Sequence, residues 1–204
     1  MILKSYQLKN LDFKKKNLIL LYGQNQGAKE EEISKILDKN QEFILKRLDE
    51  KDILNNSEIF YNTINSGSLF EKSKIVIINR GSDKIVKIIE DVLDKNLDEL
   101  IIIINSEILD KKSKLRIFFE KNKKTICVPF YPDNQDTLSK IASVFLRQNN
   151  ISISNENINL IVNKCNGDRG NLNNELNKIK FYCKNKKNIS TEDIYKLINL
   201  IENH

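Results

Sequence analysis

The residues most able to do chemistry in this chain lie in a glycine-containing turn that follows an apolar run at residues 18–22. A working phosphate loop has the pattern G-x-x-x-x-G-K-S/T, in which backbone N–H groups surround phosphates, the lysine supplies positive charge and the hydroxyl binds Mg²⁺. Gly23 and Lys29 are in register with that pattern, whereas Ala28 replaces the second glycine and Glu30 replaces the hydroxyl residue. The degenerate loop comprises Gly23, Gly27, Ala28, Lys29 and Glu30.

The two replacements weigh against catalysis at this loop. The methyl group of Ala28 hinders close approach of the backbone to a phosphate, and the carboxylate of Glu30 repels a polyanion where a magnesium ligand is needed. We therefore expect a nucleotide-type fold that has lost hydrolysis, with no cofactor and no catalytic residues. A chance glycine-rich turn before an acidic helix stays open as an alternative, because a single degenerate motif is a weak indication.

Cysteine and histidine give little support for other chemistry. Cys127, Cys165 and Cys183 are odd in number, lack C-x-x-C spacing and lie in apolar segments, and His204 is the only histidine. Disulfides, a metal site and histidine acid–base catalysis are therefore not expected. No apolar run approaches the ~18 residues of a membrane span, and the N-terminus lacks the apolar core of a secretory signal. We expect a cytoplasmic chain with no membrane partner.

The chain is basic, with a net charge of +6 at pH 7 and a pI near 9.0. This balance is compatible with binding nucleic acid, but a compositional bias toward Lys, Asn and Ile would give the same charge. Lys111, Lys112, Lys114 and Arg116 form a basic stretch at the start of an expected helix, where charge and exposed N–H groups favour phosphate contacts. A solvated helix face is the alternative interpretation of these four residues.

Apolar runs that favour β-structure alternate with helical stretches in the first part of the chain. We expect strands near residues 18–22, 42–46, 74–78, 100–104 and 125–128, and helices near residues 29–37, 50–64, 82–93 and 111–121. Because the apolar runs are continuous rather than alternating, the strands should be covered on both faces, as in a parallel sheet. The predicted fold class is α/β.

Pro129 and Pro132 mark the best boundary in the chain, because proline interrupts both strands and helices. We expect one domain at residues 1–131 and a second at residues 132–204. After the boundary the spacing of apolar residues becomes helical.

The second domain is expected to be a small helical bundle. Apolar spacing predicts helices near residues 138–145, 158–165, 168–183 and 194–201. Ser154 and Asp168 are expected N-caps, and residues 190–193 resemble a capping box with aspartate in place of glutamate. Such helices cannot complete the sheet, so they should pack by themselves.

Four stretches of the sequence, which together span nearly the whole chain, carry a resemblance to a known family. They are residues 22–30, residues 68–70 with the strand at 74–79, residues 100–105, and residues 167–168 with 174–179. An α/β domain followed by a helical lid is the plan of AAA+ modules, which have a RecA-like parallel sheet. Within that plan, the chain resembles the delta-subunit family of the bacterial DNA polymerase III clamp loader.

Other positions agree with a family that does not hydrolyse ATP. Asn79 and Arg80 stand where an active ATPase would carry the acidic pair that holds Mg²⁺. Gly170 stands about where a sensor arginine would be, and Arg169, one place earlier, is interpreted as a surface residue at a helix start.

The resemblance implies a role for Leu69 and Phe70, a pair that would otherwise be assigned to the core. In the delta family this pair is the hydrophobic plug that enters a pocket on the sliding clamp, the beta ring. The resemblance implies a subunit that grips and opens the ring for chromosomal replication, with residues 50–64 pressing near the ring interface. It also implies motor and delta-prime subunits as partners, and a non-catalytic place in a DNA-directed DNA polymerase, a nucleotidyltransferase, acting on primer-template DNA.

Members of this family usually continue past the lid into a helical collar, whereas this sequence stops at His204. Whether it is a fragment stays open; clamp binding should survive without the collar, but assembly with motor subunits is in doubt. Two other functions stay open. One is a divergent P-loop NTPase that binds nucleotide through Lys29, and the other is a lysine-rich, non-specific DNA-binding module that needs neither Leu69 nor Phe70.

Overall fold

The computed structural model describes residues 1–10, 17–65, 73–93, 100–185 and 189–199. The chain divides into two units, each described here by itself. The first unit comprises Met1–Gln24 and Lys29–Phe130, and the second comprises Asn25–Ala28 and Tyr131–His204. The phosphate-loop segment Asn25–Ala28 thus belongs to the helical second unit, which the sequence did not indicate.

The first unit is built on a parallel sheet. In the described part of the chain the sheet has the order β2-β3-β4-β1-β5, with β1 at Leu18–Tyr22, β2 at Ile44–Asp49, β3 at Lys74–Asn79, β4 at Leu100–Ser106 and β5 at Thr125–Pro129. The inner strand β1 pairs in parallel with both β4 and β5, so that Leu20 lies opposite Ile104 on one side and Cys127 on the other. The predicted α/β class with a parallel sheet is confirmed.

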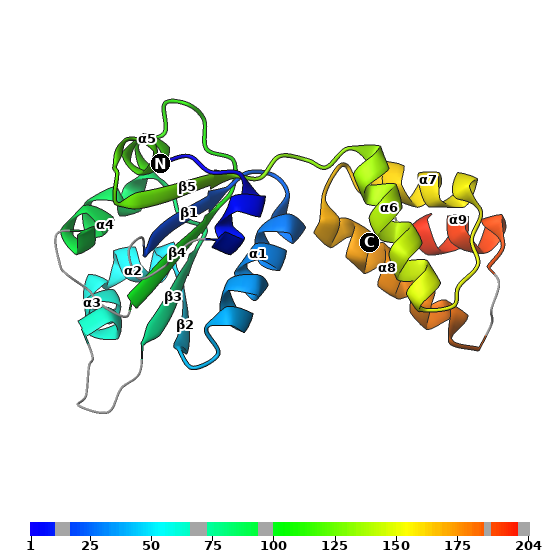
Figure 1. Ribbon diagram of the computed structural model, residues 1–204, viewed down its shortest axis with the longest axis horizontal. Coiled ribbons are helices and arrows are strands. Elements are labelled where there is room, and N and C mark those ends of the chain that lie inside the picture. Colours follow the sequence, from blue (N-terminus) through cyan, green and yellow to red (C-terminus); the bar gives the residue numbers. More distant parts are fainter. Residues whose placement is uncertain (11–16, 66–72, 94–99, 186–188, 200–204) are drawn as a thin grey trace. The chain divides into compact units, whose positions relative to one another are not determined.

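Helices cover both faces of this sheet (Figure 1). One face is covered by four helices: α2 at Glu50–Asn55, α3 at Ser57–Asn65, α4 at Val86–Leu93 and α5 at Lys114–Lys121. The short 3₁₀ turn η2 at Asp83–Ile85 directly precedes α4. The opposite face is covered by α1 at Gln26–Lys39, from Lys29 onward, and by the 3₁₀ turn η1 at Ser5–Asn10. Alternate residues of β1 therefore enter two different apolar layers, and all five residues of the strand are buried.

Two of the predicted elements in this unit are wrong in detail. The strand predicted at 42–46 with both faces buried lies at Ile44–Asp49 on the edge of the sheet, where Ile44 and Leu45 are 37% and 41% exposed. The single helix predicted at 50–64 is two helices, because Asn56 takes an extended conformation and ends the first one.

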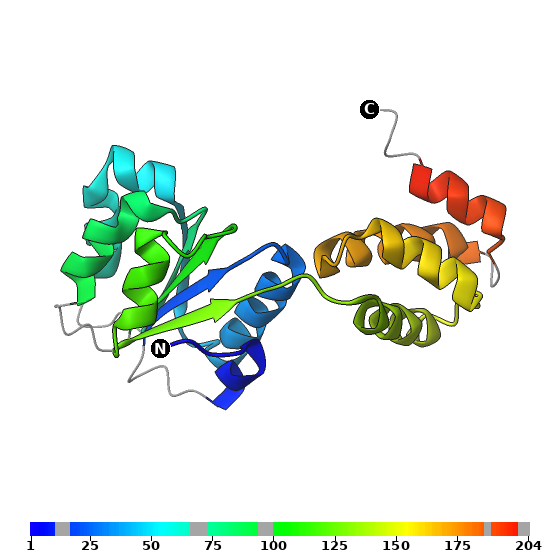
Figure 2. The ribbon, with the colours of Figure 1, turned by 90° about the horizontal axis from the view of Figure 1, so that it is seen from above.

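The described part of the second unit contains the helices α6 at Gln135–Gln148, α7 at Asn155–Lys164, α8 at Arg169–Tyr182 and α9 at Thr191–Asn199, with the 3₁₀ turn η3 at Cys183–Asn185 after α8 (Figure 2). Their apolar faces form one core of their own. The predicted N-caps are confirmed, because Ser154 and Asp168 accept hydrogen bonds from the N–H groups of Asn157 and Asn171. The aspartate capping box is confirmed as well, since Ser190 and Asp193 bond reciprocally.

The buried cysteines lead to a prediction for alkaline stability. Burial raises the pKa of the Cys127 thiol to about 12 and that of the Cys165 thiol to about 11. A folded-state pKa above the unfolded value gives stability that is complete below pH ~9 and is lost as pH rises toward 11 to 12, at about 1.4 kcal/mol per unit of difference. Denaturant unfolding at a series of pH values should show this loss. Iodoacetamide should spare both thiols in the native chain at pH 8 and modify them in urea, whereas rapid native modification would contradict their burial.

Candidate functional site

The first glycine of the degenerate loop serves the turn that ends β1. Gly23 has a φ of +128°, a conformation that favours glycine, and its N–H donates to the carbonyl of Glu107 at 3.1 Å. A Cβ at this position would lie 2.1 Å from the carbonyl oxygen of Phe130. Gly23 is therefore required by the backbone of the first unit alone, whatever the loop binds.

The loop lysine is directed toward the end of β4. Lys29 is 1% exposed, and its Nζ donates to the carbonyl of Ser106 at 2.5 Å. Glu30 accepts a hydrogen bond from Nδ2 of Asn105 at 3.2 Å. The side-chain oxygens of Asn105 and Ser106 are buried, and neither has a hydrogen-bond partner among the described residues. The charged residues of the motif are thus integrated into the carboxyl end of the sheet, where ligands of parallel α/β folds usually bind.

The segment Asn25–Ala28 is held by side chains of the second unit and by Asn25 itself. The side-chain oxygen of Asn25 accepts from the N–H groups of Ala28 and Arg169, both at 3.1 Å. Its amide nitrogen donates to the carbonyl of Tyr131 at 3.2 Å and to Asp133 Oδ2 at 2.8 Å. Since an amide has two donor hydrogens and an acceptor oxygen, Asn25 is fully satisfied within the protein.

Arg169 is not the simple surface residue that its sequence position indicated. Its Nε lies 2.6 Å from Oδ2 of Asp133 and its Nη2 lies 3.0 Å from Oδ1, so the pair is bidentate. The two side chains are 26% and 14% exposed. A bidentate arginine–carboxylate pair with this much burial fixes both side chains in direction. The guanidinium therefore neutralises a carboxylate of the same unit.

The end of β3 carries a cation where an active ATPase would need carboxylates. Arg80 has a φ of +58°, and its Nη2 lies 2.7 Å from Asp49 Oδ2. The nearby carboxylate of Glu50 is buried, and its two oxygens accept from the N–H and the hydroxyl of Ser82 at 2.6 and 2.8 Å. The carboxylates of Asp49 and Glu50 are thus bonded to Arg80 and Ser82, and they stabilise the turn after β3.

The four residues expected to contact DNA do not form one surface. Lys111, Lys112 and Lys114 are exposed, whereas Arg116 is engaged inside the first unit. The Nε of Arg116 lies 2.7 Å from Glu120, its Nη1 donates to the carbonyl of Leu109, and its guanidinium lies 5.1 Å from the centre of the Tyr22 ring. Arg116 thus contributes to the packing of the first unit, while a DNA contact of the three lysines stays a prediction.

The helix start near these lysines is already capped by protein groups. The helix expected from residue 111 begins at Lys114, because Ser113 accepts from the N–H of Arg116 and ends the preceding turn. Asp83 accepts from the N–H of Leu115 at 3.0 Å and from the Ser113 hydroxyl at 2.6 Å. Burial opposes ionisation of Asp83, but these hydrogen bonds and the charge of Lys114 lower its pKa overall. The expectation of N–H groups open to phosphates at this helix start is therefore wrong.

This separation of roles gives a prediction for charge variants. Changing Lys111, Lys112 and Lys114 to glutamine should weaken binding to duplex DNA of any sequence. It should also reduce the slope of log K against log salt concentration by up to about one unit per lysine. Arg116→Gln should instead lower the stability of the chain by about 1 to 2 kcal/mol, because it breaks packing and a partly buried ion pair. Fluorescence anisotropy at several salt concentrations and urea unfolding measure the two effects. A stable Arg116→Gln chain with impaired DNA binding would contradict this assignment.

Leu69 and Phe70 lie outside the residues that the structure describes. The described chain ends at Asn65, the last residue of α3, and resumes at Ser73, just before β3. Their assignment to a clamp contact stays a prediction.

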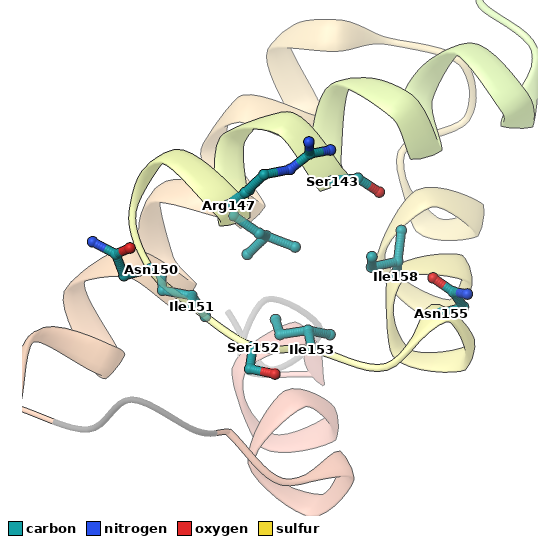
Figure 3. A pocket seen from close by; sticks show the side chains of 9 residues that line it. Ser143, Arg147, Asn150, Ile151, Ser152, Ile153, Asn155 and Ile158 are labelled. Carbon is teal, nitrogen blue, oxygen red and sulfur yellow. The ribbon is translucent and has the colours of Figure 1, made fainter.

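The second unit also has an open pocket of about 480 Å³ between α6, the following loop and the start of α7 (Figure 3). Its lining combines the apolar Leu146, Ile151 and Ile158 with polar side chains that include Arg147. Arg147 extends along α6 toward Ser143. None of the described residues that line the pocket is an acid, a cysteine or a histidine, so these side chains offer no general base.

The described part of the chain holds neither a metal-binding cluster nor a membrane-spanning helix. No group of three or more His, Cys, Asp or Glu in that part of the chain is placed to hold a metal ion. Among the same residues no helix has the length and apolarity needed to span a bilayer.

Comparison with known proteins bears on the fold. No family model and no curated protein matches the chain. A variant of RuvB from Thermotoga maritima is 12% identical and has a TM-score of 0.66 over 96% of this chain and 66% of its own. The chain has the fold of AAA+ proteins. Domain III of the replication initiation protein DnaA from the same organism is 13% identical, with a TM-score of 0.57 over 98% of this chain and 89% of its own.

A further AAA+ structure is a DNA clamp loader delta protein. The Bacillus subtilis delta protein, YqeN, is 18% identical and has a TM-score of 0.52 over 97% of this chain. This chain spans 63% of the length of that protein and 66% of the RuvB chain. At such low identity these likenesses show the AAA+ fold, and the choice between its families rests on other arguments.

Proposed function

We propose that this chain is a clamp-loader delta subunit of DNA polymerase III, which binds and opens the sliding clamp without hydrolysing ATP. The observation that carries the proposal is the state of the phosphate loop: within an ATPase fold, its N–H groups at Gly27 and Ala28 are bonded to Asp168 and Asn25. The likeness to the Bacillus subtilis clamp loader delta protein, over nearly the whole chain, supports it. A degenerate loop is what a non-hydrolysing member of this fold would have.

In the proposed mechanism, Leu69 and Phe70 insert into an apolar pocket of one clamp protomer. The helices α2 and α3, which precede these residues in the chain, press near the ring interface. The chain needs only to bind the open ring more tightly than the closed ring in order to shift the population toward the open form. No chemical step at the loop of this chain is required.

The remaining partners belong to the same proposal. Motor subunits would supply ATP hydrolysis, and they and delta-prime would be partners if a collar is present to hold the assembly together. The exposed Lys111, Lys112 and Lys114 would approach the backbone of primer-template DNA. The chain would act in the cytoplasm, as a non-catalytic part of the DNA polymerase holoenzyme during chromosomal replication.

A divergent nucleotide-hydrolysing enzyme is the second candidate, since Gly23 and Lys29 keep the register of a phosphate loop. It predicts micromolar binding of a fluorescent ATP analogue and Mg²⁺-dependent turnover, whereas the delta proposal predicts neither. A lysine-rich DNA-binding module, the third candidate, predicts salt-dependent DNA binding without any clamp contact.

The test of the proposal is calorimetric titration of the chain with the sliding clamp of its own organism, with and without ATP. The expected result is saturable binding that does not depend on ATP. A folded chain that fails to bind the clamp would reject the proposal and return attention to nucleotide and DNA titrations.

A further inference from the structure

One carboxylate of the second unit caps two helices at once. Oδ1 of Asp168 accepts from the N–H of Asn171 at 2.9 Å and caps α8. Oδ2 of the same side chain accepts from the N–H of Gly27 at 3.3 Å, in the first turn of α1. The N-terminus of a helix after a phosphate loop normally favours an anion there. In this chain the anion is the side chain of Asp168.

The neighbouring groups leave little room for a second anion. A Cβ at Gly27 would lie 1.9 Å from the backbone nitrogen of Gly170 and 2.6 Å from the carbonyl carbon of Arg169, so the two backbones are in direct contact. The backbone N–H of Arg169 is bonded to Asn25, and its guanidinium is bonded to Asp133. A phosphate at this position would have to separate the two glycines and displace Asp168.

Electrostatics point the same way. Asp133, Asp168 and Arg169 together carry one net negative charge beside the loop segment. A group of cations would attract a nucleoside triphosphate, which is strongly negative, whereas these three side chains with their net negative charge repel it. Donors, space and charge at residues 25–28 are all matched to a carboxylate of the protein.

We propose that Asp168 is a built-in ligand of the degenerate phosphate loop, which replaces nucleotide phosphate and keeps residues 25–28 bound to the helical unit in the presence and absence of nucleotide. The class of ligand that it excludes is the nucleoside polyphosphates. This device holds whether or not the chain binds a clamp, because it depends only on contacts inside the second unit.

Hydrogen exchange of the full chain tests the device, with Asp168→Ala, Asp168→Asn and Asp136→Ala compared with wild type. Asp168→Ala should speed exchange of a peptide covering residues 25–30 roughly tenfold, because it removes the cap of α8 and the acceptor of the Gly27 N–H in the first turn of α1. Asp168→Asn keeps one acceptor oxygen, which can still cap α8, but its NH₂ group cannot accept from the N–H of Gly27. In this variant the start of α8 should therefore stay close to wild type, whereas exchange of residues 25–30 should rise as it does in Asp168→Ala. Asp136→Ala is the matched control: Asp136 is an exposed aspartate in the first turn of α6, so its loss should leave residues 25–30 unchanged.

Adding anions distinguishes a phosphate replacement from a mere helix cap. Millimolar pyrophosphate should restore protection of residues 25–30 in Asp168→Ala and have no effect on wild type. Failure to restore it in a folded Asp168→Ala chain, or unchanged exchange in that variant, would overturn the proposal. If Asp168→Ala does not fold, the wild-type chain decides: protection of residues 25–28 by MgATP overturns the proposal, and unchanged exchange supports it.

Discussion

Replacing Leu69 and Phe70 by alanine is expected to weaken binding of this chain to its sliding clamp by at least a hundredfold. Burial of two such apolar side chains contributes roughly 3 to 6 kcal/mol before the costs of association, and each 1.4 kcal/mol is about a factor of ten in affinity. A few central apolar anchors usually carry most of the energy of such an interface. Calorimetric titration of the clamp with wild type and the double variant measures the effect.

Two controls make this result specific to the pair. Ile108→Ala removes another apolar side chain, which is 63% exposed and lies between β4 and α5, and should leave clamp affinity unchanged. Circular dichroism must show that the double variant is folded. Equal clamp affinity of the double variant and wild type would remove Leu69 and Phe70 from the interface.

Gly27→Ala should destabilise the second unit by about 3 kcal/mol or more, because the new methyl group would overlap backbone atoms. The nearest are the nitrogen of Gly170 at 1.9 Å and the carbonyl carbon of Arg169 at 2.6 Å, neither of which can rotate away. Separating these backbones also breaks the bond from the Gly27 N–H to Asp168. Urea unfolding followed by circular dichroism, with fluorescence of a label on the second unit, measures the loss.

Gly170→Ala is the matched comparison on the other side of the same contact. Its Cβ would lie 2.9 Å from Oδ1 of Asp168, a side-chain atom that can shift, and 3.4 Å from the Cα of Gly27. We expect a stability within about 1 kcal/mol of wild type, since alanine also favours the helix. Similar stabilities for Gly27→Ala and wild type would show that the backbones separate at little cost.

Much of the fold follows from apolar spacing, and the failures occur where burial depends on distant neighbours. The runs at residues 18–22, 74–78 and 100–104 are continuous because helices cover both faces of the central strands, so spacing alone predicts them. The strand β2 contains apolar residues too, but its place on the sheet edge exposes Ile44 and Leu45. Edge position is a property of the strand order, which the local sequence does not contain.

The candidate site likewise combines features that the local sequence predicts with features that depend on distant residues. The mismatches at Ala28 and Glu30 could be found by comparison with the motif, and Asp168 could be recognised as a cap from local chemistry. The contact of Gly27 with Asp168 joins residues 141 positions apart, and no periodicity links them. The glycine at position 170, interpreted as a missing sensor residue, has a steric role that only the three-dimensional structure shows.

The two hydrogen bonds accepted by Asp168 would make the proposed loss of nucleotide chemistry hard to reverse in evolution. Restoring glycine at position 28 and a hydroxyl at position 30 would repair the motif in the sequence, yet the N–H groups of Gly27 and Ala28 would remain with Asp168 and Asn25. Removing Asp168 first would take away the cap of α8 and the acceptor of the Gly27 N–H in α1 before any ligand could replace it. If the loop has lost nucleotide binding as proposed, each single substitution that restores the motif is therefore either destabilising or without effect on binding.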